Sequence, residues 1–218
     1  MEIKLIKNVL EVNERQSEEN KKIFDAHGIF VCNIMSSPGS GKTTLLQKTI
    51  PVIKERSRVA VIEGDIYTTR DALRLKEFNI PVVQINTGGG CHLNAAMIAE
   101  AMKALPLKDL DAVIIENVGN LVCPAEFNIG EDEKILIYSI TEGDDKPAKY
   151  PLSFTNAGAI VINKMDLAPY CQVNIDKLKL EINQHNNTAP LFMVSALKGS
   201  GLIPWTDWLL SKIENKSR

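Results

Sequence analysis

Short apolar runs alternate with longer stretches of helical periodicity along most of the chain. The apolar runs have the length of buried strands and cover residues 29–35, 58–62, 82–86, 112–116, 135–140, 159–163 and 191–194. Helical spacing occurs at residues 43–53, 71–78, 93–105, 175–184 and 205–213. A polar stretch at residues 12–27, followed by Gly28, predicts a further and mostly solvated helix.

This alternation of strands and helices predicts an α/β fold. Successive parallel strands need a long crossover connection, which is usually a helix. We therefore expect a mainly parallel, seven-stranded sheet with helices on both faces. The 218 residues suit one domain, and no repeat or linker divides them. Residues 29–218 are expected to form that domain, with residues 1–28 as an N-terminal helical arm.

Composition and charge exclude several classes of protein. The 25 basic and 27 acidic residues give a formal charge of −2, so there is no electrostatic case for general nucleic-acid binding. No apolar run approaches the roughly 20 residues that a membrane-spanning helix needs. The four cysteines are widely spaced, unlike the disulfide framework of a small secreted protein. We expect a cytoplasmic protein with reduced thiols.

A glycine-rich segment between the first predicted strand and the next helix matches a phosphate-binding P-loop. Residues 36–43 read Ser-Ser-Pro-Gly-Ser-Gly-Lys-Thr, and the strand–loop–helix context is the one a P-loop requires. Gly39 and Gly41 allow backbone N–H groups to surround phosphates at a helix N-terminus. Lys42 is expected to neutralise the β- and γ-phosphates, and Thr43 to bind magnesium. Ser36 replaces the usual first glycine, a change that we expect to be tolerated.

Two later segments predict that the bound base is guanine. Asn163-Lys164-Met165-Asp166 ends a predicted strand, at the sheet edge where open α/β folds bind ligands. A carboxylate at Asp166 can accept from the N1–H and the exocyclic amine of guanine, whereas adenine would present a ring lone pair. Ser195 and Ala196 follow the next strand and can present backbone N–H groups to guanine O6.

The strand at 112–116 ends in a candidate nucleotide switch. Glu116 and Gly119 have the spacing of the Asp-x-x-Gly of many GTPases, with Glu in place of Asp. Glu116 is expected to position magnesium through water, and the Gly119 N–H to sense the γ-phosphate. Asp65 can reach the metal or orient the attacking water, or it is a turn residue. The residues expected to contact nucleotide are Gly39, Ser40, Gly41, Lys42, Thr43, Thr44, Gly119, Asn163, Lys164, Asp166, Ser195 and Ala196, and those expected to act in catalysis are Lys42, Asp65 and Glu116.

Cys91, His92 and Cys123 form a candidate site for a softer metal. Thiolate and imidazole ligands suit zinc, nickel or copper, and do not suit magnesium. Spacing alone favours a structural role for these residues. However, both segments leave strands at the edge of the sheet that carries the P-loop, so the three ligands can meet near the switch. Cys32, Cys171, His27 and His185 are interpreted as packing or solvated side chains.

Taken together, these segments resemble the HypB family of hydrogenase maturation GTPases. The resemblance covers nearly the whole chain after residue 28, and Glu116-Asn-Val-Gly-Asn-Leu-Val-Cys-Pro124 is its most specific part. It is carried by residues 36–44, 62–65, 87–93, 115–124, 141–151 and 163–166.

The resemblance implies a SIMIBI-type G domain that dimerises when GTP binds. GTP hydrolysis is expected to be slow, because no arginine finger is evident in the motifs. The resemblance further implies nickel or zinc at the dimer interface, held by residues matching Cys91, His92 and Cys123. Nickel would be delivered, together with a small metallochaperone partner, to a nickel-iron hydrogenase large-subunit precursor. Lys146 would contact nucleotide or partner across the dimer, or it is an exposed lysine in a salt bridge. The sequence has no Cys-rich or His-rich stretch, so this nickel site is expected to be the only one.

Three alternatives stay open at this point. A urease accessory GTPase would share the G domain and a nickel role, although the Gly-Cys-His segment favours the hydrogenase family. A small-molecule phosphotransferase would need an arginine-rich lid, and Arg56, Arg58, Arg70 and Arg74 do not cluster in such an insertion. A passive metal-binding protein would have no need of Lys42 or Thr43.

Overall fold

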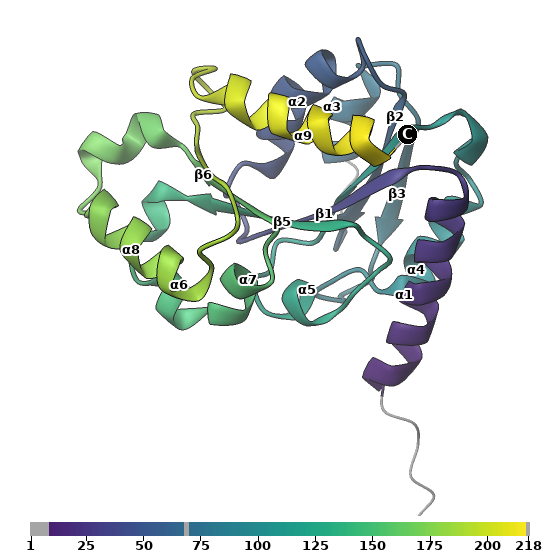
Figure 1. The fold of residues 1–218 in the computed structure, drawn as a ribbon, viewed down its shortest axis with the longest axis horizontal. Helices are drawn as coiled ribbons and strands as arrows, with labels where there is room; N and C mark the ends of the chain where they lie inside the picture. The colour runs from purple at the N-terminus through teal and green to yellow at the C-terminus, as the bar shows by residue number, and fades with distance from the viewer. Residues whose placement is uncertain (1–8, 68–69, 217–218) are drawn as a thin grey trace, which may run out of the picture.

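The computed structural model describes residues 9–67 and 70–216 and has the predicted α/β architecture (Figure 1). Its sheet has seven strands in the order β3-β2-β4-β1-β5-β6-β7, and every neighbouring pair is parallel. The strands are β1 Phe30–Ser36, β2 Val59–Asp65, β3 Val82–Asn86, β4 Ala112–Glu116, β5 Glu133–Ser139, β6 Ala159–Asn163 and β7 Leu191–Met193. The predicted sheet is thus confirmed.

Helices cover both faces of the sheet, with α2, α3 and α9 on one side and α1, α4, α7 and α8 on the other (Figure 1). Strands β1, β4 and β6 are buried on both faces, so their side chains alternate between the cores on the two sides of the sheet. In β1, Cys32 and Ile34 join the core under α2 and α9, whereas Val31 joins the core under α1 and α4. The longer helices are α1 Val9–Ala26, α2 Lys42–Ile53, α3 Arg70–Lys76, α4 Ala95–Met102, α8 Ile175–His185 and α9 Leu202–Lys216.

Several short helices were not predicted from the sequence. They are α5 Cys123–Glu126, α6 Lys146–Lys149 and α7 Pro151–Thr155, together with the 3₁₀ turns η1 Leu107–Asp109, η2 Ile140–Glu142 and η3 Met165–Tyr170. Each is too short for a 3.6-residue period to show in the pattern of apolar positions. Proline in the first turn of α5, α6 and α7 instead marks where each begins.

Helix α1 packs against the domain through one face, while its other face is solvated. Phe24 is fully buried, and Asn20 Nδ2 donates to the Ala95 carbonyl at 2.7 Å and to the Ile129 carbonyl at 3.1 Å. Asn13 Oδ1 accepts from the Ala95 N–H at 2.9 Å. The first eight residues of the predicted arm and residues 217–218 lie outside the described residues, and the division of the chain at residue 28 stays a prediction.

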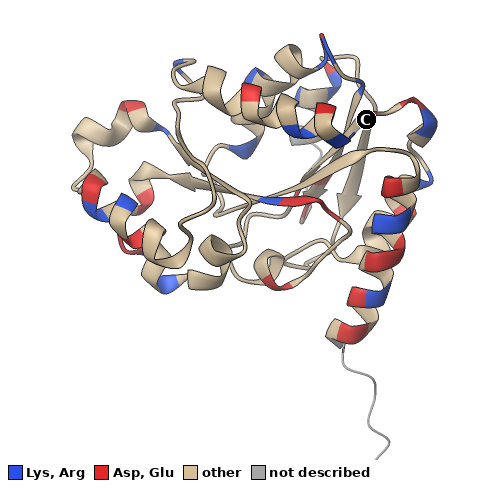
Figure 2. Cartoon of the chain, in the orientation of Figure 1, with Lys and Arg blue, Asp and Glu red and all other residues tan. Residues whose placement is uncertain are grey.

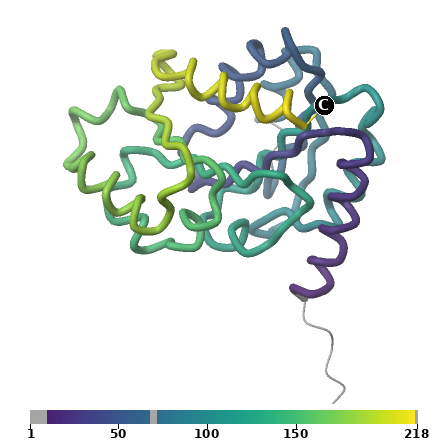
Figure 3. The backbone as a smooth tube through the Cα atoms, viewed as in Figure 1, coloured from purple at the N-terminus to yellow at the C-terminus, as the bar shows by residue number. Residues whose placement is uncertain are grey.

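The C-terminal end of α1 lies beside the C-terminal end of α9, as the backbone trace shows (Figure 3). Charges of both signs are interspersed along these helices (Figure 2). At their meeting point Lys216 Nζ lies 2.5 Å from Asp25 Oδ1 and 2.7 Å from Asp132 Oδ1. Within the described part of the chain, no helix is long and apolar enough to cross a membrane.

Candidate functional site

The P-loop joins the end of β1 to the start of α2. Gly39 and Gly41 have φ angles of 74° and 94°, in the left-handed region that favours glycine. Lys42 Nζ donates to Ser36 Oγ at 2.8 Å, so the serine at the unusual first position is a hydrogen-bond partner of the P-loop lysine. The N-cap residue of α2, Gly41, makes no side-chain capping bond, which leaves the helix N-terminus suited to binding an anion.

Carboxylates gather beside the P-loop threonine. Thr43 Oγ1 donates to Glu116 Oε1 at 2.8 Å, and Glu116 is 2% exposed. The register of β2 and β4 places Glu63, also 2% exposed, next to Glu116. Both line a cavity of about 240 Å³ together with Lys42 and Asp65. Oxygen ligands of this kind suit magnesium.

Glu63 was not among the predicted site residues. The apolar run predicted a strand that ended at residue 62, whereas β2 continues to Asp65 because Glu63 to Asp65 pair with β3. A glutamate at the carboxyl end of an otherwise apolar strand was the available signal. Asp65 lines the cavity, and its Oδ1 accepts from the Tyr67 N–H at 2.8 Å, so it also has the turn role that was the alternative interpretation.

The switch segment lies directly against the P-loop. A Cβ on Gly119 would be 3.0 Å from Pro38 Cα, so glycine permits this close approach. Ser36 forms a β-bridge with Asn120, which fixes the segment to the end of β1. An adjoining cavity of about 320 Å³ is lined by Gly39, Gly41, Lys42, Thr43, Thr44, Arg74, Glu116 and Lys164. Arg74 was not predicted to lie here.

The Asn-Lys-x-Asp segment connects the P-loop to the loop after β7. Asn163 is 1% exposed; its Nδ2 donates to the Ser40 carbonyl at 3.0 Å, and its Oδ1 accepts from the Ala196 N–H at 3.0 Å. Lys164 Nζ donates to the Gly39 carbonyl at 2.6 Å. A Cβ on Gly41 would lie 2.6 Å from Asn163 Nδ2, so only glycine fits there. Asn163 and Lys164 thereby fix the P-loop relative to the loop after β7.

Asp166 is held by Ser195, whose Oγ donates to Asp166 Oδ1. The predicted contact of Ser195 and Ala196 with guanine O6 stays a prediction. In this structure the Ser195 N–H donates to the Ser200 carbonyl at 3.0 Å, and the Ala196 N–H is bonded to Asn163.

Lys146 is linked to the P-loop of its own chain through Glu142. Glu142 Oε2 accepts from Ser37 Oγ at 2.6 Å, and Lys146 Nζ lies 3.9 Å from the same oxygen. Lys146 Nζ is also 5.0 Å from the centre of the Tyr150 ring. A contact of Lys146 across a dimer stays a prediction.

Cys91, His92 and Cys123 lie together. Cys91 Sγ is 3.1 Å from Cys123 Sγ and 3.6 Å from His92 Nδ1, and one ligand atom from each residue lies within 4.8 Å of the others. Cys91 and His92 come from the connection between β3 and α4, and Cys123 begins α5. The predicted convergence is therefore present, and two sulfur donors with one nitrogen suit zinc or nickel.

The surroundings of the cluster set the protonation of its ligands. Burial lowers the pKa of His92, and this effect exceeds the smaller rise caused by the negative charge of Glu126. The lower pKa favours the neutral imidazole, which is the form that binds metal. The Phe127 ring packs on the His92 ring with a centroid distance of 4.2 Å. The pKa of the Cys123 thiol is raised, first by its hydrogen bond with Cys91 and then by burial.

Side chains from distant segments fix the backbone that carries Cys123. Asn120 Nδ2 donates to the Cys91 carbonyl at 3.2 Å, and its Oδ1 accepts from the Val122 N–H at 2.9 Å. Lys134 Nζ and Asn156 Nδ2 donate to the Ala125 carbonyl at 2.9 and 3.0 Å. Asn120 lies within the Glu116–Pro124 segment, although no role was predicted for it, whereas Lys134 and Asn156 belong to no predicted motif.

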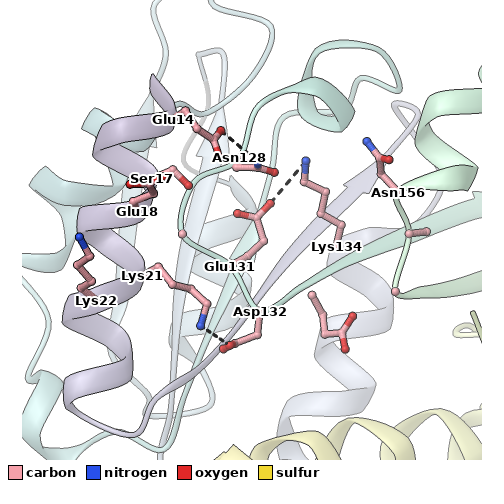
Figure 4. Close-up of a pocket in the computed structure, with 14 residues that line it drawn as sticks. Glu14, Ser17, Glu18, Lys21, Lys22, Asn128, Glu131, Asp132, Lys134 and Asn156 are labelled. Carbon is pink, nitrogen blue, oxygen red and sulfur yellow. Dashed lines mark hydrogen bonds and ion pairs between the residues drawn. The ribbon is translucent and has the colours of Figure 1, made fainter. Parts of the chain in front are cut away.

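Another cavity, of about 740 Å³, lies at the amino ends of the strands, opposite the P-loop (Figure 4). It separates α1 from the segment before β5. Two ion pairs lie in it: Lys21 Nζ is 2.8 Å from Asp132 Oδ1, and Lys134 Nζ is 3.8 Å from Glu131 Oε1. Its lining includes more carboxylates than lysines and shares no residue with the nucleotide cavities.

Comparison with known proteins supports the assignment of these segments. Residues 30–193 match the family model of the CobW/HypB/UreG nucleotide-binding domain. The hydrogenase maturation factor HypB of Escherichia coli K12 is 46% identical over 202 residues, which cover 93% of this chain and 70% of the relative. The hydrogenase/urease maturation factor HypB of Helicobacter pylori is 38% identical, with 97% and 88% covered.

Solved structures show the same fold. HypB from H. pylori in complex with nickel has a TM-score of 0.88 at 37% identity, covering 95% of this chain and 97% of that one. HypB from Archaeoglobus fulgidus has a TM-score of 0.87 at 36% identity, with 94% and 100% covered. The signal recognition particle receptor FtsY of Elizabethkingia anophelis, at 16% identity and a TM-score of 0.57, shares the fold alone. The chain therefore belongs to the HypB hydrogenase maturation factors of the CobW/HypB/UreG nucleotide-binding family.

Proposed function

We propose that this chain is a GTP-hydrolysing metallochaperone that assists nickel insertion into a nickel-iron hydrogenase precursor. One observation carries the proposal: the segment that lines the nucleotide cavity with Glu116 and Gly119 continues directly into Cys123 of the metal cluster. The relative from E. coli is named a hydrogenase maturation factor, and the H. pylori structure contains nickel. These names support nickel as the cargo and a hydrogenase as the client.

In the proposed GTPase cycle, each residue has one task. Lys42 neutralises the β- and γ-phosphates, while Thr43, Glu116 and Asp65 hold magnesium directly or through water. The Gly119 N–H senses the γ-phosphate, and Asp166 reads guanine. Turnover without a partner is expected to be slow, about 10⁻⁴ to 10⁻² per second, as in small GTPases that lack a supplied arginine.

The metal cycle follows from the cluster of Cys91, His92 and Cys123. These residues would hold nickel or zinc through two thiolates and one imidazole, and the ion would be cargo for delivery. Three ligands leave a four-coordinate metal one ligand short, so water or a second copy of the chain supplies the fourth. A second copy fits the GTP-dependent homodimer that the family likeness implies. Exposure of Cys91 would allow transfer to a small metallochaperone partner or to the client.

Urease maturation is a second candidate, because the H. pylori relative is named for both hydrogenase and urease. The phosphotransferase alternative receives no support from the relatives. The cytoplasm remains the expected compartment, with neither nucleic acid nor a membrane as partner.

The test is a titration with nickel and with zinc of the protein loaded with GDP or with a non-hydrolysable GTP analogue. We expect one site that needs Cys123, with an affinity that differs between the two nucleotide states. Cys123→Ala should abolish that site, whereas Cys171→Ala, at a half-buried thiol outside the cluster, should keep it. Equal affinities with both nucleotides would contradict GTP-gated delivery.

A further inference from the structure

One buried carboxamide joins the metal segment to the nucleotide switch. Asn117 is 1% exposed and follows Glu116 at the end of β4. Its Oδ1 accepts from the Leu93 N–H and from the Val118 N–H, both at 2.9 Å. Leu93 directly follows the metal ligand His92, and Val118 directly precedes the switch glycine. A single oxygen atom thus accepts hydrogen bonds from the segment of His92 and from the segment of Gly119.

The orientation of this carboxamide is fixed by its other bonds. Asn117 Nδ2 donates to Asn33 Oδ1 at 3.0 Å, and Asn33 Nδ2 donates to Glu131 Oε1 at 3.2 Å. The Asn117 N–H donates to the Ile34 carbonyl at 3.0 Å. Asn33 and Ile34 belong to β1, the strand that leads into the P-loop. With its amino group held by β1, the Asn117 oxygen cannot rotate away from Leu93 and Val118 without leaving a buried polar group unbonded.

Only small movements of the switch are compatible with these contacts. Gly119 packs on Pro38, so a shift of the segment at the γ-phosphate moves Val118 as well. If Val118 moves, the shared oxygen either follows it, which alters its hydrogen bond with the Leu93 N–H, or loses the bond with the Val118 N–H. The arrangement at Leu93, and with it the position of His92, then depends on which nucleotide is bound.

Resting on the proposed GTP-gated metal function, we infer that Asn117 is the positioning residue that couples nucleotide state to metal affinity. Asn117 lines the cavity beside the P-loop together with Glu116 and Val118, and it is not a member of the metal cluster. Its proposed action is through the backbone N–H groups of Leu93 and Val118. Reciprocity requires that nickel changes nucleotide affinity by the same factor by which nucleotide changes nickel affinity.

The experiment measures that coupling factor, the ratio of nickel dissociation constants with GDP and with the GTP analogue, in the wild type and in Asn117→Ala. We expect Asn117→Ala to reduce the factor to within about twofold of one, the range of uncoupled sites. The control is Thr206→Ala, which removes another buried and hydrogen-bonded polar side chain. Thr206 is 4% exposed, and its Oγ1 donates to the Leu202 and Ile203 carbonyls within α9, on the face of the sheet opposite α4 (Figure 1). This control should keep the wild-type factor even if it unfolds at a lower temperature.

The two proposals fail in different ways. A wild-type factor of one would overturn the proposed gating itself. A wild-type factor that persists unchanged in Asn117→Ala would overturn only the role of Asn117. If Asn117→Ala does not fold, amide hydrogen exchange on the wild-type protein decides. Nickel added to the GDP form should change the exchange rate of the Val118 N–H, and the GTP analogue that of the Leu93 N–H. Unchanged rates at both amides would refute the inference.

Discussion

The nucleotide side and the metal side of this molecule are built in different ways. Around the P-loop, buried side chains at strand ends bond to neighbouring backbone groups, as Asn163 does to the Ser40 carbonyl and the Ala196 N–H. The metal ligands instead lie in a loop and a four-residue helix, and Cys91 is exposed. A site made by strand ends is positioned by the sheet, whereas the metal site depends on a few hydrogen bonds between loops. Such a cluster is suited to taking up and releasing its ion.

The largest expected effect comes from removing the P-loop lysine. Lys42→Ala should reduce GTP hydrolysis by at least about 10²-fold, because a preorganised positive group at the transferring phosphate is lost. Phosphate release and nucleotide titration measure the loss. Lys48→Ala, at an exposed position of the same helix, is the control. Nickel binding to nucleotide-free Lys42→Ala should be unchanged; a parallel loss would mean that the two regions are not separate.

A second change tests the reading of the base. Asp166→Asn should weaken GTP binding by about 10²-fold, since the carboxylate that accepts from two guanine donors is replaced by a group with one acceptor. The readout is the ratio of GTP to ATP affinity, which should fall, while nickel affinity is retained. Asp176→Asn, in the first turn of α8, provides a matched loss of charge. Undiminished preference for GTP in Asp166→Asn would refute the assigned role.

A third change addresses the metal side. His92→Ala should lower nickel affinity by about 10- to 100-fold, since one of three ligands is lost while both thiols remain. GTP affinity measured without nickel should stay at the wild-type value. His185→Ala, at the end of α8, removes a histidine outside the cluster and should bind nickel normally. If His92→Ala bound nickel as the wild type does, the metal would have a different ligand set.

The sheet could be predicted from the sequence because apolar runs and buried parallel strands coincide. Strands β3, β4 and β6 have the predicted bounds. The differences arise where polar residues pair within the sheet, as Ser36 does with Ile137 and Asp65 with Asn86. Hydropathy ends a strand where polarity begins, but backbone hydrogen bonds continue. This is why Glu63 was missed as a neighbour of Glu116.

The predicted convergence of the metal ligands also followed from the fold, since the two segments leave the carboxyl ends of β3 and β4, the strands on either side of β2. Their supporting side chains could not be predicted. Besides a local backbone N–H each, Asn117 and Asn120 bond partners that lie 24 to 84 residues away in sequence. Asparagine is common in turns, so its type alone does not distinguish a coupling residue from a turn residue.

The smallest expected effect is on stability and comes from an ion pair remote from both the nucleotide side and the metal side. It tests whether the amino ends of the strands influence either side. Arg58 precedes β2 and donates through Nη2 to Asp111 Oδ1 at 2.7 Å, at the amino ends of the strands. This hydrogen bond holds the pKa of Asp111 below its ordinary value of 3.8. A carboxyl group with a lower pKa in the folded state stabilises the protein above its unfolded pKa, and that contribution is lost as pH falls through the folded pKa.

Asp111→Asn should therefore cause a small loss of stability at pH 7, small because Arg58 is exposed and the pair is screened by solvent. Below pH 3.8 the difference from the wild type should shrink, because the wild-type carboxyl group also becomes protonated. Urea unfolding of both proteins at pH 7 and below pH 3.8 measures the difference in stability under each condition. GTP and nickel affinities should match the wild type at pH 7. A change in either would mean that the amino ends of the strands communicate with the sites at their carboxyl ends, and that the division into two local regions is too simple.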